Sequence, residues 1–324
     1  MLLPLLTVLV AFAILVWSAD LFVAGAASIA ENAGLSPVII GLTIVSLGTS
    51  APEILVSITA ALAGSGGLAV GNAVGSNIAN LGLVLGVTVL IVPLQVYPGC
   101  LRSELPTLLA ITAGTGLLLL DVELERGDAL LMLGALAVIM WQMVRTQDHV
   151  VEAGATLDED ELPHLKPFKA WLAFGVGLVL LIISSRMLVW GASTVALELG
   201  VSELVIGLTI VAVGTSLPEL AATIASALRG HAEIAIGNVI GSNMFNLLVV
   251  MAMPGLLAPD DLPDNFLVRD YGAMCIATLL LAVAVYVGRF HKRAKPDHGY
   301  LSRTVGALFV AGYALYYYWL FQTS

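Results

Sequence analysis

Residues 41–53 read GLTIVSLGTSAPE, and residues 71–80 read GNAVGSNIAN. Both segments return 166 residues further along the chain, as GLTIVAVGTSLPE at 207–219 and as GNVIGSNMFN at 237–246, without insertion or deletion. Each copy places one glutamate directly after a proline inside an apolar stretch. An unpaired charge inside a lipid bilayer costs several kcal/mol, so its occurrence at the same place in both copies indicates a functional site that the copies share.

The composition is that of a polytopic membrane protein. Hydrophobic residues make up 59% of the 324 residues and charged residues only 11%, whereas soluble domains carry about 25% charged residues. About 20 apolar residues suffice to cross a bilayer. We therefore expect an all-α membrane protein with ten transmembrane helices, near residues 4–28, 37–62, 68–93, 103–120, 126–145, 168–197, 201–228, 233–257, 268–288 and 301–321.

The distribution of charge predicts the orientation of these spans. If the N terminus lies outside, ten basic residues fall in or beside cytoplasmic loops: Arg102, Arg145, Lys166, Lys169, Arg229, Arg289, Lys292, Arg293, Lys295 and Arg303. On the outer side lie only Arg126 and Arg269. This positive-inside bias predicts a multi-pass protein of the plasma membrane with both termini outside.

The chain divides into two halves of five spans. Residues 1–145 form the first five-helix repeat and residues 168–324 the second, joined by an acidic cytoplasmic linker at 146–167. The linker contains the run DEDE, which favours a solvated connection over a regulatory ion site. Because five is odd, the second half must enter the membrane upside down relative to the first. Inverted repeats place their substrate near the midplane, so we expect the spans that carry the repeated segments to form the centre.

Two prolines predict where helices break at this centre. Pro52 has no backbone N–H, so the carbonyl of Gly48 loses its helical donor. Pro218 acts on Gly214 in the same way. Irregular backbone survives at this depth only where it lines a cavity or is buried in protein. We expect main-chain oxygens to turn inward near the breaks, at Ser46, Thr49, Ala212 and Thr215.

The side chains of the repeats supply donors for a cation. Thr49, Ser50 and Glu53 can share one helix face, and each copy spaces a serine four residues before an asparagine. Together the copies offer carboxylates, amides and hydroxyls without sulfur or imidazole: Glu53, Glu219, Asn80, Asn246, Ser50, Ser216, Ser76 and Ser242. Such hard oxygen donors suit Ca²⁺, which takes about 6–8 oxygens at about 2.3–2.6 Å, and also Na⁺.

Three features have a second interpretation. The repeated glycines could serve close helix packing instead of a site, at Gly71, Gly75, Gly237 and Gly241. The hydroxyls of Ser76 and Ser242 could bond only to their own helix. Asp20 and Arg186 occupy equivalent positions with opposite charges and could form an ion pair between spans 1 and 6, although inversion would leave them about 10 Å apart in depth.

The signatures GTSxPE and GNxxGSNxxN, present in order in both halves, resemble the α-repeats of the Ca²⁺/cation antiporters, in particular the bacterial and archaeal Na⁺/Ca²⁺ exchanger branch. The resemblance covers essentially the whole chain. It implies that Glu53 and Glu219 share Ca²⁺, completed by the carbonyls of Thr49 and Thr215. It also implies two flanking Na⁺ positions with Asn80 and Asn246 between them: Ser46, Ser50 and Ser76 with Glu53, and Ala212, Ser216 and Ser242 with Glu219. Spans 1 and 6 would slide across the remaining bundle to alternate access.

Two departures from related patterns refine this expectation. Some exchangers, including K⁺-dependent ones, have Asp where this chain has Asn246, so K⁺ co-transport is not expected. Proton-coupled relatives usually show GNAAE in the first signature, where this chain has GTSAPE, which favours Na⁺ coupling. The resemblance thus implies a secondary antiporter and not an enzyme. We expect Ca²⁺ and Na⁺ as substrates within a lipid bilayer, no cofactor beyond these transported ions, no nucleic acid and no obligatory protein partner.

Three other functions stay open at this point. An H⁺/Ca²⁺ or other divalent-cation antiporter would share the architecture. A cation channel would pass current without a counter-ion. An intramembrane enzyme is disfavoured because the sequence contains no paired aspartates and no Ser/His arrangement that would indicate hydrolysis.

Overall fold

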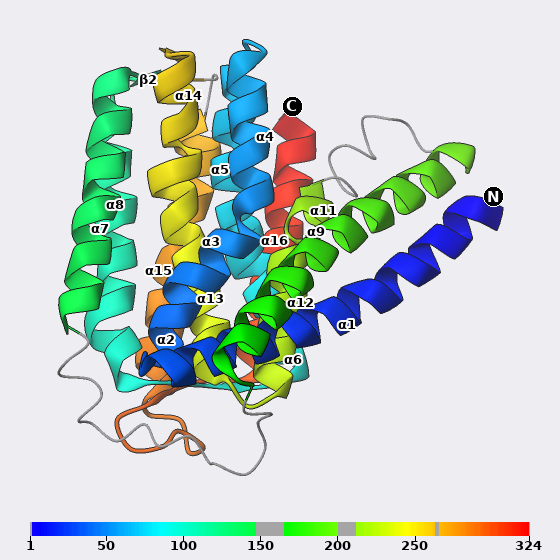
Figure 1. Ribbon diagram of the computed structural model, residues 1–324. Helices are drawn as coiled ribbons and strands as arrows, with labels where there is room; N and C mark the ends of the chain where they lie inside the picture. Colours follow the sequence, from blue (N-terminus) through cyan, green and yellow to red (C-terminus); the bar gives the residue numbers. More distant parts are fainter. Residues whose placement is uncertain (1, 147–164, 200–211, 263–265, 324) are drawn as a thin grey trace.

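The computed structural model describes residues 2–146, 165–199, 212–262 and 266–323, and these are helical almost throughout (Figure 1). The acidic run of the predicted linker and residues 207–211, which begin the second copy of the repeated segment, lie outside the described residues. The first half contains, in order, α1 (Leu2–Ala33), α2 (Pro37–Ile40), the π-helix η1 (Gly41–Val45), α3 (Ser46–Thr49), α4 (Ala51–Leu62), α5 (Gly66–Ala79), η2 (Asn80–Leu85), α6 (Gly86–Ile91), β1 (Leu94–Val96), η3 (Cys100–Glu104), α7 (Leu105–Leu118), β2 (Glu123–Leu124) and α8 (Arg126–Thr146).

The second half contains, in order, α9 (Pro167–Glu198), α11 (Ala212–Thr215), α12 (Leu217–Leu228), α13 (Ala232–Phe245), η7 (Asn246–Val250), α14 (Ala252–Leu257), β3 (Asp260–Asp261), η8 (Phe266–Tyr271), α15 (Gly272–Gly288), β4 (Gly299–Leu301) and α16 (Arg303–Thr323). From α11 to η8 the elements of the second half begin 166 residues after their counterparts in the first half, and those from α15 onward follow at larger offsets. The bounds of α12 and α13 follow those of α4 and α5 by 166 residues. In both halves a π-helical turn begins at the asparagine that closes the repeated segment. Such turns are rare and occur frequently at functional sites.

The described helices are those of a membrane protein. Seven are long and apolar enough to cross a bilayer, or eight if the bent pair Pro37–Thr49 and Ala51–Leu62 is one span. All ten predicted spans coincide with helical segments, but α7 is short and the span predicted at 201–228 is described only from residue 212.

Both predicted helix breaks are confirmed. In the first half α3 ends at Thr49 and α4 begins at Ala51, with a bend of 44° across the break. In the second half α11 ends at Thr215 and α12 begins at Leu217. The serine between the two helices has a ψ angle of 1° in the first half and 6° in the second, outside the helical range. Each proline then lies in the first turn of the next helix, where a missing N–H removes no helical bond.

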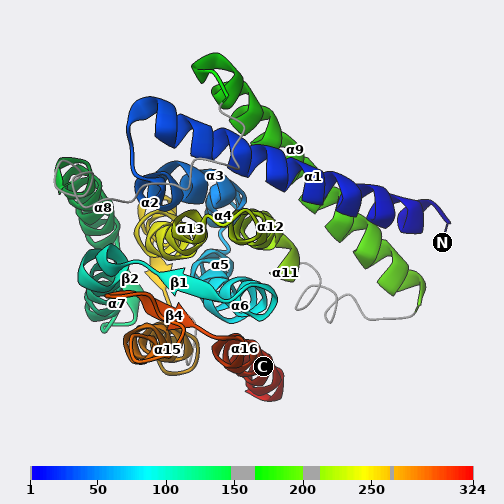
Figure 2. The same ribbon diagram turned by 90° about the horizontal axis from the view of Figure 1, so that it is seen from below.

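The repeated segments lie at the centre of the bundle, as expected from the sequence (Figure 2). In the most apolar stretch of Ala232–Leu257, 94% of the residues are buried, and in Gly66–Ile91 72% are buried. The corresponding values for α1 and α9 are only 28% and 33%. Ala232–Leu257 and Gly66–Ile91 are therefore surrounded mostly by protein, whereas α1 and α9 are not.

Helices α1 and α9 form an outer pair on one side of the bundle (Figures 1 and 2). Gly177 of α9 lies against Phe22, where an added Cβ would be 2.6 Å from the backbone nitrogen. Gly191, further along α9, lies against Pro4 near the start of α1. The two helices therefore run antiparallel, and glycine allows their backbones to approach closely.

Glycine also explains close packing of the second repeat against the first. A Cβ added to Gly237 would lie 3.0 Å from the carbonyl oxygen of Val38, and one added to Gly241 would lie 2.5 Å from that of Leu42. The equivalent glycines of the first copy meet nothing described within 4 Å. The packing interpretation is thus confirmed for the second copy, where α13 presses against α2 and η1.

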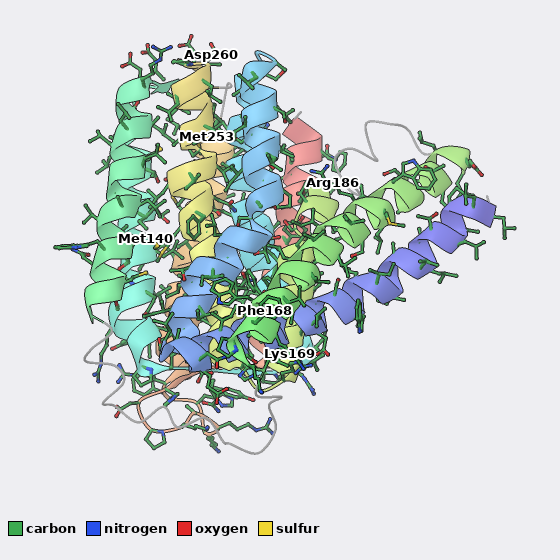
Figure 3. All side chains as sticks on the ribbon, in the orientation of Figure 1. Met140, Phe168, Lys169, Arg186, Met253 and Asp260 are labelled. Carbon is green, nitrogen blue, oxygen red and sulfur yellow. The ribbon has the colours of Figure 1, made fainter. Side chains whose placement is uncertain are left out.

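Two small antiparallel sheets join the halves at opposite ends of the bundle. In β1 and β4 Leu94 lies opposite Leu301, and in β2 and β3 Glu123 lies opposite Asp261. β2 is at the top of Figure 1, whereas β1 and β4 face the viewer in Figure 2, which looks from below. Figure 3 shows acidic Asp260 at the upper end of the molecule and basic Lys169 toward the lower end.

Candidate cation-binding site

The two repeated glutamates occupy equivalent, buried positions. Glu53 lies in the first turn of α4 and Glu219 in the first turn of α12, each directly after a helix break. Their side chains are only 1% and 2% exposed. The positive end of a helix dipole favours a carboxylate at this place. Among the described residues no lysine or arginine forms an ion pair with either glutamate.

Most of the other predicted donors are buried in the same core. The following residues are each 6% exposed or less: Ser46, Thr49, Ser50, Ser76, Asn80, Ser216, Ser242 and Asn246. Thr215 is half-buried at the end of α11. For Ala212 the structure describes only the backbone, at the start of α11.

Hydrogen bonds and packing bring the two repeats together at this centre. The bonds that cross between them include Ser50 Oγ to Glu219 Oε1 (3.3 Å), Thr49 Oγ1 to Asn238 Oδ1 (3.1 Å), Asn77 Nδ2 to the Asn243 carbonyl (3.3 Å) and Ser57 Oγ to the Val250 carbonyl (2.7 Å). In addition, α4 packs against η7 and α12 packs against η2. The helix that carries each glutamate therefore faces the π-helical turn of the other repeat.

Several buried polar atoms of this core have no hydrogen-bond partner among the described residues. They are Oε2 of Glu53 and of Glu219, both amide atoms of Asn80 and of Asn246, and Oγ of Ser216 and of Ser242. An unpaired buried polar group costs about 1–3 kcal/mol, and native proteins contain few of them. The oxygens in this set, contributed by both repeats, are the hard donors that Ca²⁺ and Na⁺ prefer.

The serines and carbonyls near the breaks differ in what they bond. Ser46 Oγ donates to the Leu42 carbonyl (2.7 Å), so this hydroxyl is engaged with its own helix. The Ser46 carbonyl accepts the N–H of Ser50 (2.9 Å), so the break does not free that oxygen, contrary to expectation. The carbonyl of Gly214 is freed as predicted, and it accepts a hydrogen bond from Ser185 Oγ of α9 (2.9 Å).

Two asparagines hold the backbone of the glutamates, and the sequence reasoning missed them. Asn72 Nδ2 donates to the Glu53 carbonyl (3.0 Å), and Asn238 Nδ2 donates to the Glu219 carbonyl (3.5 Å). Asn238 also donates to Thr223 Oγ1 (2.9 Å). The sequence does contain a signal that could have indicated them. Each asparagine is the second residue of the repeated GN motif, and each lies the same number of residues after its glutamate.

The suggested ion pair between Asp20 and Arg186 is wrong. Asp20 instead pairs with Arg229, which directly follows α12. The contact of Gly177 with Phe22 sets the register of the antiparallel outer pair. In this register Asp20 lies opposite a residue of α9 that precedes Arg186 by about seven positions. Arg186 is therefore about 10 Å from Asp20 along the helix axis. Arg186 is exposed on α9 (Figure 3).

Comparison with known proteins agrees with this architecture. The model of the family described as sodium/calcium exchanger protein matches residues 3–145 and 169–322. The chain is 42% identical to CaxA of Alkalimonas amylolytica over 327 residues, covering 100% of both chains. It is 36% identical to YrbG, an inner membrane protein of Escherichia coli, over 99% of this chain and 98% of that protein.

Solved structures of the sodium-calcium exchanger NCX_Mj share the fold. One, soaked with Na⁺ and Ca²⁺, superposes on this chain with a TM-score of 0.80 at 28% identity, covering 97% of each chain. The family match extends over both halves and leaves out mainly the segment between them. The chain therefore belongs to the sodium/calcium exchanger protein family of membrane transporters.

Proposed function

We propose that the protein is a secondary active antiporter that exchanges Na⁺ for Ca²⁺ at one central site shared by its two repeats. The observation that carries this proposal is the pair Glu53 and Glu219, buried after two helix breaks, each with a carboxylate oxygen that no described residue bonds. Two buried carboxylates without a basic partner require a cationic counter-charge. Membership of the exchanger family supports Na⁺ and Ca²⁺ as the cations.

In this proposal ten spans form two inverted five-helix repeats, at 1–145 and 168–324, around the linker at 146–167. The shared order of elements supports the repetition, and the antiparallel pair α1 and α9 supports the inversion. The positive-inside bias supports a cytoplasmic linker and termini on the outer side. The similarity to an inner membrane protein supports the plasma membrane as the location.

The ligands follow the repeat symmetry. Glu53 and Glu219 hold Ca²⁺ between them, together with the main-chain oxygens of Thr49 and Thr215. Two Na⁺ positions flank it, and Asn80 and Asn246 line the space between: one position uses Ser46, Ser50 and Ser76, the other Ala212, Ser216 and Ser242. Ser50 already reaches Glu219 across the repeat boundary, which supports a single site rather than two separate ones.

The charge of this site determines its electrical behaviour. Two carboxylates are neutralised by one Ca²⁺ or by two Na⁺, whereas three Na⁺, the number that the family resemblance implies, leave one positive charge. Exchange of one Ca²⁺ for three Na⁺ moves net charge across the membrane. The membrane potential then contributes about 2.3 kcal/mol per charge per 100 mV. We propose electrogenic export of Ca²⁺, driven by inward movement of Na⁺.

Two polar links couple the outer pair to the broken helices. Ser185 of α9 donates to the freed carbonyl of Gly214, and Asp20 of α1 pairs with Arg229 after α12. Both links end on the segment that carries Glu219. Sliding of α1 and α9 across the bundle would therefore act directly on one half of the site, which supports alternating access by this route.

Ion flux into proteoliposomes tests the proposal. Uptake of ⁴⁵Ca²⁺ is measured with a Na⁺, H⁺ or K⁺ gradient imposed separately, and we expect only the Na⁺ gradient to drive it. Uptake driven by a pH gradient without Na⁺ would instead identify an H⁺/Ca²⁺ antiporter. Current carried by Ca²⁺ without any counter-ion would identify a channel.

A further inference from the structure

An open basic pocket lies at the end of the molecule where α15 is followed by α16. Its volume is about 790 Å³. The polar part of its lining consists of His291, Lys292, Arg293, Ser302, Arg303 and Thr304. Of the described residues that line it, none is acidic. The pocket therefore selects for an anion, and it is remote in sequence from the repeated segments.

The loop that carries these side chains is fixed to the bundle. The pairing of β1 with β4 anchors it, and Gln95 bonds it twice, to the Arg293 carbonyl (2.8 Å) and to the Lys295 N–H (3.2 Å). The ring of His291 stacks on Tyr300 with centroids 4.5 Å apart. A ligand would thus meet cationic side chains on a backbone that is already held in place, which lowers the entropic cost of binding.

An apolar surface leads into this pocket along α15. Leu280, Val283 and Val287 are exposed and spaced three or four residues apart, so they share one face of the helix, and exposed Phe290 follows just after the helix ends. Phe290 is 78% exposed, and it also lines the pocket. Figure 2 shows α15 and α16 at the edge of the bundle away from α1 and α9. The anion that fits this surface is one with an apolar tail.

We propose that the pocket binds the phosphate headgroup of an anionic phospholipid, with the acyl chains lying along the apolar face of α15. Guanidinium groups bond phosphate oxygens in a bidentate manner, and the two hydroxyls can donate further bonds. Basic pockets beside membrane helices attract anionic headgroups, with a gain of about fivefold in affinity for each positive charge. This site is separate from the proposed ion site and does not depend on it.

Lipid titration of the purified full chain in detergent, followed by native mass spectrometry, tests this site. We expect phosphatidylglycerol to saturate one position and phosphatidylcholine to bind it at least about fivefold more weakly. The double variant Lys292→Gln with Arg293→Gln should lose about 25-fold in phosphatidylglycerol affinity. The matched control is Lys295→Gln, an exposed lysine of the same loop that does not line the pocket, and it should change affinity less than about twofold.

Three outcomes would overturn the proposal. Equal losses in the pocket variant and in Lys295→Gln would show only general charge attraction. Equal affinity for the two lipids would remove the role of the headgroup charge. Inorganic phosphate binding as tightly as phosphatidylglycerol would assign the pocket to a soluble anion.

Thermal melting without added lipid verifies that the variants fold. If the double variant does not fold, the single variant Lys292→Gln should still lose about fivefold in affinity for phosphatidylglycerol. The titration involves no transport, so its result is independent of the proposed exchange.

Discussion

The centre of the molecule and its outer helix pair are built from opposite kinds of contact. At the centre, polar side chains of both repeats meet, and several of their oxygens bond to no described residue. In the outer pair, α1 and α9 meet through glycines and apolar side chains, and none of the proposed ligands lies on either helix. The proposed ion ligands are therefore held by the buried core of the bundle. The helices proposed to move contact each other through glycines and apolar side chains, and polar links join them to the bundle.

Removing charge from the centre should have the largest effect. We expect Glu53→Gln or Glu219→Gln to reduce ⁴⁵Ca²⁺ uptake at least about 100-fold, because loss of one partner from a buried charge cluster costs about 3–5 kcal/mol. Glu123→Gln, which changes an exposed glutamate of β2, is the control and should transport normally. Uptake at the parent rate in either central variant would remove the site assignment.

Overpacking the contact between α1 and α9 should distort the helix pair that is proposed to move, without altering the ligands of the site. Gly177→Ala places a Cβ 2.6 Å from the backbone of Phe22, and overpacking of this kind costs about 1–3 kcal/mol. We expect the exchange rate to fall while equilibrium Ca²⁺ affinity, measured by calorimetry, stays the same. Gly175→Ala on the same helix, where nothing described lies within 4 Å, is the matched control. A fall in affinity with an unchanged rate would contradict the division between centre and outer pair.

The asparagines behind the glutamates should matter less than the glutamates themselves. Asn238→Ala removes bonds to Thr49, Thr223 and the Glu219 carbonyl, and groups left unpaired by such a change cost about 1–3 kcal/mol. Asn72→Ala removes a single described bond, to the Glu53 carbonyl, so its effect should be smaller. Isothermal titration with Ca²⁺ measures both. An equal or reversed order of the two losses would show that these bonds do not position the carboxylates.

The ion pair between α1 and the end of α12 should contribute little. Asp20 is 53% exposed, and pairs as exposed as this one contribute about 0–1 kcal/mol. We expect Asp20→Asn to change the exchange rate less than about fivefold. A double-mutant cycle should find coupling between Asp20 and Arg229 and none between Asp20 and Arg186. Coupling to Arg186 instead would restore the pairing suggested by the repeat positions.

The smallest effect concerns acid stability at the loop before α13. Burial lowers the pKa of His231 from its ordinary value, Glu233 raises it and Arg229 lowers it further. The folded state thus prefers the neutral ring, so this stabilisation is complete above the ordinary pKa of about 6.5 and is lost as the pH falls below it. His231→Gln should show a smaller drop in melting temperature between pH 7.5 and pH 5.5 than the parent. An identical drop in both proteins would exclude this histidine as the cause.

Local rules explain why much of the fold was predictable. Pro52 and Pro218 prevent one continuous helix because each lacks a backbone N–H, which is a property of the residue and not of its surroundings. The repeat of Glu53 at Glu219 indicated a shared centre for the same reason, since burying a charge is expensive in any fold. The breaks and the central position of the repeats are confirmed, while the assignment of individual ligands stays a prediction.

Contacts between segments far apart in the chain depended on the tertiary structure and could not be predicted from the sequence. Asp20 bonds to Arg229 and not to Arg186 because antiparallel packing of α1 against α9 separates equivalent positions in depth. The bonds from Asn72 and Asn238 to the glutamate carbonyls depend on how helices return beside the breaks. Composition and repetition determined which residues are too costly to bury without a partner, and only three-dimensional packing determined which partner each residue meets.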